Sequence, residues 1–63
     1  MKRKFETSHG TVEVRDAMID TDGTNLEEGV EVKLDGKYVS ELWNIHVREI
    51  NKNNIEQLIE NLV

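Results

Sequence analysis

Hydrophobic and polar residues alternate along much of this sequence, and the first stretch of alternation predicts a β-hairpin. Residues 4–15 alternate on both sides of His9-Gly10, where glycine supplies the positive φ that a tight turn requires. A two-residue turn at this position places Phe5 opposite Val14. These side chains then share one face of the hairpin with other uncharged residues, and charged residues occupy the opposite face.

A second hairpin is predicted around residues 35 and 36. Residues 30–34 alternate strictly, and Asp35-Gly36 is the strongest short hairpin signal in the chain. The return strand begins directly after the turn. A two-residue turn then pairs Val32 with Val39, and by extension residue 30 with residue 41.

The segment that follows the second hairpin has two possible interpretations. Residues 43–48 alternate cleanly, which favours either one long bent strand or two strands that meet at a bulge near Glu41-Leu42. A helix that begins at Ser40 is the alternative. We prefer the strand, because the apolar positions of such a helix would spread over about 200° of arc and several are β-branched.

The C-terminal segment has helical periodicity. Asn51 or Asn53 can cap this helix: Asn53 has Glu56 three residues later, and Asn51 would make a hydrophobic staple of Ile50 with residue 55. A helix of roughly ten residues is marginal alone, so its apolar side must pack on the sheet. The apolar positions follow the spacing i, i+3, i+4, i+7: Ile55, Leu58, Ile59 and Leu62.

Together these elements predict an α+β fold in a single domain over residues 1–63. The expected architecture is a small antiparallel β-meander of about four strands in two hairpins, with one C-terminal α-helix packed on one face. In the simple register Trp43 points into the core under the helix, and Tyr38 and Leu42 point to the opposite face. One helix covers one face only, so the other face is expected to meet a partner or a second copy of the chain.

Composition limits how this small fold can be stabilised. A chain of 63 residues buries only roughly 60% of the surface that its unfolded form exposes, so its stability is marginal. It has no cysteine for disulfides or thiolate sites, which is consistent with a reducing compartment. No signal-like or membrane-spanning apolar run is evident. We therefore expect a soluble cytoplasmic protein that contacts no membrane and gains stability from an efficient core or from dimerisation.

Charge is distributed unevenly along the chain. The formal net charge is −5, whereas residues 1–15 sum to +2. An acidic surface repels phosphate backbones, so no direct nucleic-acid partner is expected there. Residues 16–35 sum to −6, with Lys33 opposed by seven acidic residues: Asp16, Asp20, Asp22, Glu27, Glu28, Glu31 and Asp35.

The stretch DTDGTNLEEG, residues 20–29, looks at first like a calcium-binding loop. With Gly23 at the sixth position of an EF-hand, Asp20 and Asp22 fit the third and fifth, but the final bidentate glutamate is replaced by Gly29. We therefore predict no metal or cofactor, and interpret the stretch as an Asx-rich turn in a loop that joins two strands. The alternation before it, over residues 17–19, is irregular and suggests a bulge or bend.

No constellation of residues predicts catalysis. His9 and His46 are in no metal-ligand spacing, and His9 follows Ser8 directly in a turn, which points the two side chains apart. The pair Glu27-Glu28 would need an enclosed pocket to raise one pKa, and so small a sheet has little room for one. We expect a protein that is not an enzyme.

The predicted function is a non-enzymatic interaction module whose acidic segment occludes a basic surface of another protein, for example a nucleic-acid-binding protein. In size and charge the chain is similar to the small acidic inhibitors that phages and mobile elements encode against host nucleases, with no shared motif. The alternative is a structural protein that forms a homodimer through an apolar sheet face or a strand edge. The predicted contact residues are Asp20, Asp22, Glu27, Glu28, Glu31, Tyr38 and Leu42.

Overall fold

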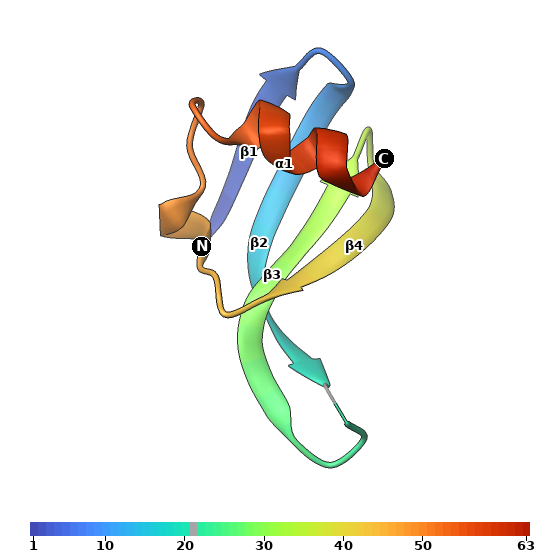
Figure 1. Ribbon diagram of the computed structural model, residues 1–63, viewed down its shortest axis with the longest axis vertical. Coiled ribbons are helices and arrows are strands. Elements are labelled where there is room, and N and C mark those ends of the chain that lie inside the picture. The colour runs from blue at the N-terminus through green and yellow to red at the C-terminus, as the bar shows by residue number, and fades with distance from the viewer. Residues whose placement is uncertain (21) are drawn as a thin grey trace.

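The computed structural model describes residues 1–20 and 22–63, and shows four antiparallel strands in one open sheet with a C-terminal helix on one face (Figure 1). The strands follow each other in the order β1-β2-β3-β4. The predicted α+β meander is therefore confirmed. The elements are β1 (Lys2–Thr7), β2 (Gly10–Asp20), β3 (Leu26–Leu34), β4 (Lys37–Trp43), the 3-10 turn η1 (Val47–Glu49) and α1 (Ile55–Leu62).

The first hairpin forms with a register two residues away from the predicted one. Phe5 pairs with Val12 and not with Val14, because the chain turns one residue earlier than expected. Thr7 pairs with Gly10, and its hydroxyl donates a hydrogen bond to the Gly10 carbonyl at 2.8 Å, which closes the turn. A shift by two residues leaves every side chain on its predicted face, since side chains alternate with period two.

Strands β2 and β3 pair without interruption, from Val12 opposite Leu34 at one end to Asp20 opposite Leu26 at the other. The bulge or bend predicted over residues 17–19 is therefore wrong. The loop predicted over residues 20–29 is wrong at residue 20 and at residues 26–29, which belong to strands, and its residue 21 lies outside the described residues. Glutamate and glycine have low strand propensity, but continuous pairing with β2 gives their backbone groups hydrogen-bond partners and overrides that preference.

The second hairpin confirms the Asp35-Gly36 turn, whose residues have φ of 51° and 84°. Farther from the turn the predicted pairing of Val32 with Val39 is wrong, because Val32 pairs with Ser40. Val39 is the extra residue of a β-bulge, which lies two residues before the position considered from the sequence. A bulge of one residue reverses the face of every side chain after it.

The bulge corrects the predicted positions of two large side chains. Val30 now pairs with Leu42, so Leu42 shares the helix side of the sheet and packs against the core. Trp43 pairs with Gly29 on the opposite face and is 54% exposed, so its predicted place in the core is wrong. Tyr38 precedes the bulge and keeps its predicted place on the face away from the helix.

The strand predicted through residue 50 is also wrong, because β4 ends at Trp43. Asn44 has φ of 59°, a left-handed conformation that asparagine tolerates, and η1 follows. The Glu49 carboxylate accepts a hydrogen bond from the His46 N–H at 2.8 Å, which stabilises the turn. The apolar residues of this segment reach the core from a loop and a 3-10 turn.

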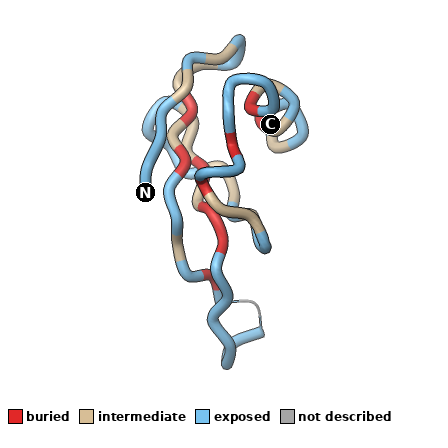
Figure 2. The backbone as a smooth tube through the Cα atoms, turned by 90° about the vertical axis from the view of Figure 1, so that its left-hand side faces the viewer, coloured by how far each residue is buried: buried red, intermediate tan, exposed pale blue. Residues whose placement is uncertain are grey.

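Helix α1 packs across the upper part of the sheet, as predicted from its periodicity (Figures 1 and 2). The N-cap residue of α1 is Asn54, which makes no side-chain cap hydrogen bond, so the predicted cap at Asn51 or Asn53 is wrong. The Asn51 side chain instead accepts hydrogen bonds from the N–H groups of Asn53 and Asn54 in the turn before the helix. Ile50 and Ile55, the expected staple pair, are both buried. The core cluster consists of Val12, Val14, Val30, Val32, Val47, Ile50, Ile55 and Ile59.

Beyond this core, β2 and β3 continue together as a two-stranded projection (Figure 1). We call it the arm and define it as residues 16–20 and 22–29. The arm accounts for the long dimension of the molecule, which extends over 37 × 20 × 18 Å. Most of its length is exposed (Figure 2). The acidic centre of the sequence is thus presented on a projection from the body.

Candidate functional site

The helix-side face of the arm combines exposed apolar and acidic side chains. Met18 lies opposite Glu28 across the two strands, and Asp20 lies opposite Leu26. Residues that pair directly share one face of the sheet, and this face is the one that carries the core valines farther along. Met18 is 56% exposed and Leu26 is 63% exposed. The arm therefore offers apolar surface next to carboxylates on a single face.

Two of the predicted contact residues have a structural role in the loop at the tip of the arm. The Asp22 carboxylate accepts hydrogen bonds from the N–H groups of Thr24 at 2.9 Å and Asn25 at 2.8 Å. These bonds, with that from Thr24 first, lower the pKa of Asp22 to about 2. Asp20 accepts a bond from the Gly23 N–H at 2.6 Å. The predicted Asx-rich turn is confirmed, and both carboxylates fold the tip.

Glu27 and Glu28 are the two predicted contact residues of the arm whose carboxylates do not fold its tip. Both are exposed, and Glu27 has no side-chain hydrogen bond or ion pair with the described part of the chain. The Oε2 atom of Glu28 lies 3.6 Å from the Nε2 atom of His46. The sequence of the arm contains five carboxylates and no lysine or arginine, so its potential is strongly negative.

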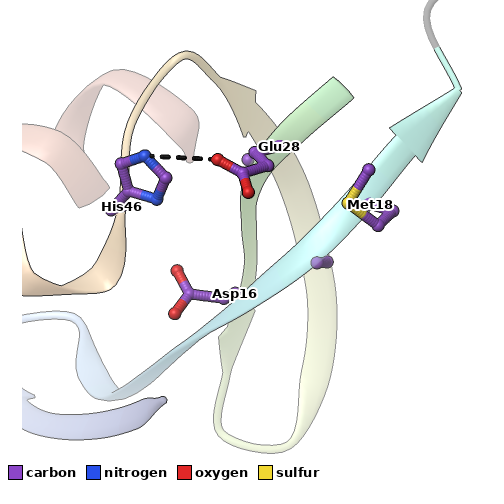
Figure 3. Close-up of a pocket in the computed structure, with 6 residues that line it drawn as sticks. Asp16, Met18, Glu28 and His46 are labelled. Atoms are coloured by element: carbon purple, nitrogen blue, oxygen red, sulfur yellow. Dashed lines mark ion pairs between the residues drawn. The ribbon is translucent and has the colours of Figure 1, made fainter. Parts of the chain in front are cut away.

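Where the arm joins the body there is a pocket of about 330 Å³ (Figure 3). The pocket is lined by Asp16, Ala17, Met18, Glu28, Gly29 and His46. Figure 3 shows Asp16 and Glu28 projecting from neighbouring strands toward the side on which His46 lies. The three side chains come from β2, β3 and the loop before η1, so only the folded chain brings them together.

Asp16 ties the base of the arm to the covering segment. Its Oδ1 accepts a hydrogen bond from the Val47 N–H at 3.1 Å, and its Oδ2 lies 3.4 Å from the Met1 amino group. The bond from Val47 is the main cause that lowers the pKa of Asp16 below its usual value. The Asn44 N–H also donates to the Glu28 carbonyl at 3.4 Å. These contacts hold the pocket in shape.

The remaining predicted contact residues lie elsewhere. Glu31 is on the opposite face of the sheet, where it is 3.2 Å from Arg15 and 3.9 Å from Lys33. Tyr38 is on that face too and is 59% exposed; partial desolvation, aided by Glu41, raises the pKa of its hydroxyl. Leu42 packs against the core, so it is not part of any exposed surface with the others.

A second hollow, of about 440 Å³, lies between β1 and α1 and includes Lys4, Phe5 and Lys52 in its lining. Next to it the Glu56 carboxylate accepts hydrogen bonds from the N–H and the hydroxyl of Ser8, at 2.8 and 2.7 Å. Ser8 and its neighbour His9 thus belong to a turn that is fastened to the helix. This site explains how the first hairpin is held and has no grouping that suggests chemistry.

Among residues 1–20 and 22–63 no three histidine, cysteine, aspartate or glutamate side chains are grouped to hold a metal ion. In the same residues no helix has the length and apolarity to cross a membrane. Comparisons of the chain with known protein families, with curated proteins and with solved structures find no match. The function must therefore be argued from the arm and its base.

Sequence reasoning missed the apolar side chains of the arm and the pocket at its base. The sequence predicts Met18 next to a loop and Leu26 inside it, and no periodicity identifies them as neighbours. The missing signal was register: once β2 and β3 pair without a break, Met18 must share a face with Glu28. His46 could not be placed either, since its position depends on the bend at Asn44.

Proposed function

We propose that the protein is a non-enzymatic interaction module whose arm binds a basic surface of another protein and occludes it. The observation that carries the proposal is the projection of the most acidic part of the chain, with exposed Met18 and Leu26, beyond the body of the fold. Carboxylates on a projection steer it toward arginine and lysine clusters and accelerate encounter. The apolar side chains then supply desolvated contact.

A nucleic-acid-binding protein is a suitable target for such a module. Its working surface is basic, and an acidic projection placed on that surface competes with the phosphate backbone by charge. The module needs no catalytic group for this action. The absence of cysteine is compatible with action in the cytoplasm, which is part of the proposal.

The test is affinity capture from the native lysate at low salt, with a salt gradient for elution. The arm variant Glu27→Gln/Glu28→Gln removes two exposed carboxylates that fold no part of the tip. Its matched control, Glu41→Gln/Glu60→Gln, removes the same charge from β4 and α1. We expect proteins captured by the wild type and the control to be lost with the arm variant, and to elute as salt screens the charges. Identical capture by both variants would refute the proposal.

A homodimer is the second candidate, and one observation favours it. Tyr38 and Trp43 are 59% and 54% exposed on the sheet face that α1 leaves open. Pairing through this face would bury both aromatic rings in a second copy of the chain. Light scattering at high salt tests this idea with Tyr38→Ser/Trp43→Ser: a wild-type dimer that becomes a monomer supports it, and a wild-type monomer at millimolar concentration excludes it.

A further inference from the structure

The layer that covers the sheet stops at the pocket beside His46. From Asn44 onward the chain covers the helix-side face of β2, β3 and β4 with a loop, η1 and α1. The same face continues into the arm without a cover, and Met18 and Leu26 stand on this uncovered part. The helix-side face of the arm is therefore uncovered, and it is continuous with the covered face of the body.

The apolar positions on this face are close enough to act together. Met18 lies opposite Glu28, and Leu26 lies two residues from Glu28 on the same face, so the two apolar side chains are diagonal neighbours across the strands. Diagonal neighbours in an antiparallel pair are about 7–8 Å apart, within reach of one inserted side chain. Methionine adapts its shape to the group that it contacts.

Charge decides what can occupy this surface. The arm of a second copy would bring five more carboxylates against these five, so self-association through this face is opposed. Nucleic acids and anionic membrane surfaces are opposed for the same reason. A basic protein segment is attracted, and Glu28 is open to pair with it: its side chain is 72% exposed, and among the described residues it faces the His46 imidazole at 3.6 Å.

We propose that the helix-side face of the arm, with the pocket beside His46, binds a basic segment of a partner in which an apolar side chain is flanked by arginine or lysine. The inference rests on the proposed function and names the chemistry that the arm recognises. The apolar side chain inserts between Met18 and Leu26. The flanking cation enters the pocket, where the Glu28 carboxylate accepts its N–H groups and Asp16 adds negative potential.

The spacing of the site defines the partner segment. Glu28 and Met18 are direct cross-strand neighbours, so the cation and the apolar group of the ligand are separated by about 5 Å. An extended segment presents side chains of one face every second residue, about 6.6–6.8 Å apart, which lies between this distance and the diagonal to Leu26 of about 7–8 Å. A segment with a basic residue and an apolar residue at positions i and i+2 presents both on the same face, and their flexible stems can meet both requirements.

The test uses the full chain with labelled methionine methyl groups and three nine-residue peptides. In the first, arginine and leucine alternate at every second position with serine between them, so that one extended face carries both. The second has serine in place of leucine, and the third has glutamate in place of arginine. Binding is followed by NMR at the Met18 methyl group and at the Trp43 indole, which reports the opposite face. We expect the arginine–leucine peptide to shift Met18 and leave Trp43 unchanged, with about tenfold tighter binding than the arginine–serine peptide.

Two variants separate the apolar from the charged contribution. Met18→Ser/Leu26→Ser changes exposed residues only, so the fold is retained, and it should reduce the affinity of the arginine–leucine peptide to that of the arginine–serine peptide. The control Tyr38→Ser, on the opposite face, should leave the affinity unchanged. Denaturant unfolding of each variant verifies that it is folded.

The possible outcomes distinguish this inference from the proposed function. Equal binding of both basic peptides, lost with Glu27→Gln/Glu28→Gln, would preserve an acidic docking arm and overturn the apolar recognition. A shift at Trp43 in place of Met18 would overturn the choice of face. No shift with any basic peptide at millimolar concentration would overturn both proposals, and binding of the glutamate–leucine peptide would overturn the role of charge.

Discussion

Ile19 occupies the space over Gly29, on the sheet face opposite the helix, where a side chain on Gly29 would begin. A Cβ atom added to Gly29 would collide with the terminal carbon of Ile19 and with the Leu42 carbonyl oxygen. Ile19 is almost fully buried as a result, although it lies in the arm and outside the core cluster. Glycine at this position thus lets the arm and the end of β4 approach closely where the pocket is formed.

We expect Gly29→Ala to destabilise the protein by about 1–3 kcal/mol, because one of the colliding atoms belongs to the backbone and cannot move aside. Urea unfolding followed by circular dichroism measures the change. The double variant Ile19→Ala/Gly29→Ala removes the side-chain collision, so the penalty of adding Ala at residue 29 should be smaller in an Ile19→Ala background. A Gly29→Ala variant as stable as the wild type would contradict the close approach.

The bulge at Val39 predicts opposite sensitivities for two adjacent residues. Leu42 packs against the core opposite Val30, whereas Trp43 is half exposed opposite Gly29. We expect Leu42→Ala to cost about 2 kcal/mol or more, as for truncation of a leucine packed in a core. Trp43→Ala, although it removes a larger side chain, should cost less. Unfolding curves of the two variants decide the point, and the reverse order would restore the register without a bulge.

The second hairpin turn and the helix could be predicted because each has a strong local signal. Asp35-Gly36 requires little more than its two residues to turn, and the helix follows from the spacing of its isoleucines and leucines. The bulge could not be predicted in place, since Val39 is as suitable for a regular strand as for a bulged one. Its position is decided by which of Leu42 and Trp43 fits under the helix, and this is a property of the packed core.

The sequence predicted the negative charge of the candidate site but not which carboxylates are exposed on it. The acidic segment, residues 16–35, is visible in the sequence. However, the carboxylates of Asp20 and Asp22 fold the tip, and the carboxylate of Glu31 pairs with Arg15 within the sheet. Glu27 and Glu28 remain on the open arm. Local composition does not reveal which carboxylates are used internally, because that depends on hydrogen bonds that only the folded hairpin makes.

Asp16 should make part of the stability dependent on pH. The Val47 N–H lowers the pKa of Asp16 in the folded state, so below the usual pKa of 3.8 the unfolded chain takes up a proton first. Its contribution is complete above that value and is lost as the pH falls through the lower folded pKa. We expect Asp16→Asn to flatten the acid limb of the stability curve, measured by urea unfolding between pH 2 and 6.

The matched control for Asp16 is Glu60→Gln, which removes a charge from the exposed side of α1. This variant should keep the wild-type acid limb. If Asp16→Asn and Glu60→Gln give the same curve, the hydrogen bond to Val47 does not stabilise the charged form of Asp16.

Asp22 should control the tip of the arm and leave the body unaffected. Its carboxylate bonds the N–H groups of Thr24 and Asn25, and these bonds lower its pKa to about 2. Asp22→Ala removes Oδ1, the acceptor of both bonds, so the amides of Thr24 and Asn25 should exchange with solvent faster, while the urea midpoint changes little because the tip lies outside the core. The Asp22→Asn side chain keeps a carbonyl acceptor and should retain most of the protection.

In the wild type the protection of these amides should fade as the pH falls from 3.8 toward 2, since Asp22 binds its proton more tightly in the unfolded tip than in the folded tip. Uniform exchange in all three proteins would show that the tip is ordered by its strands alone.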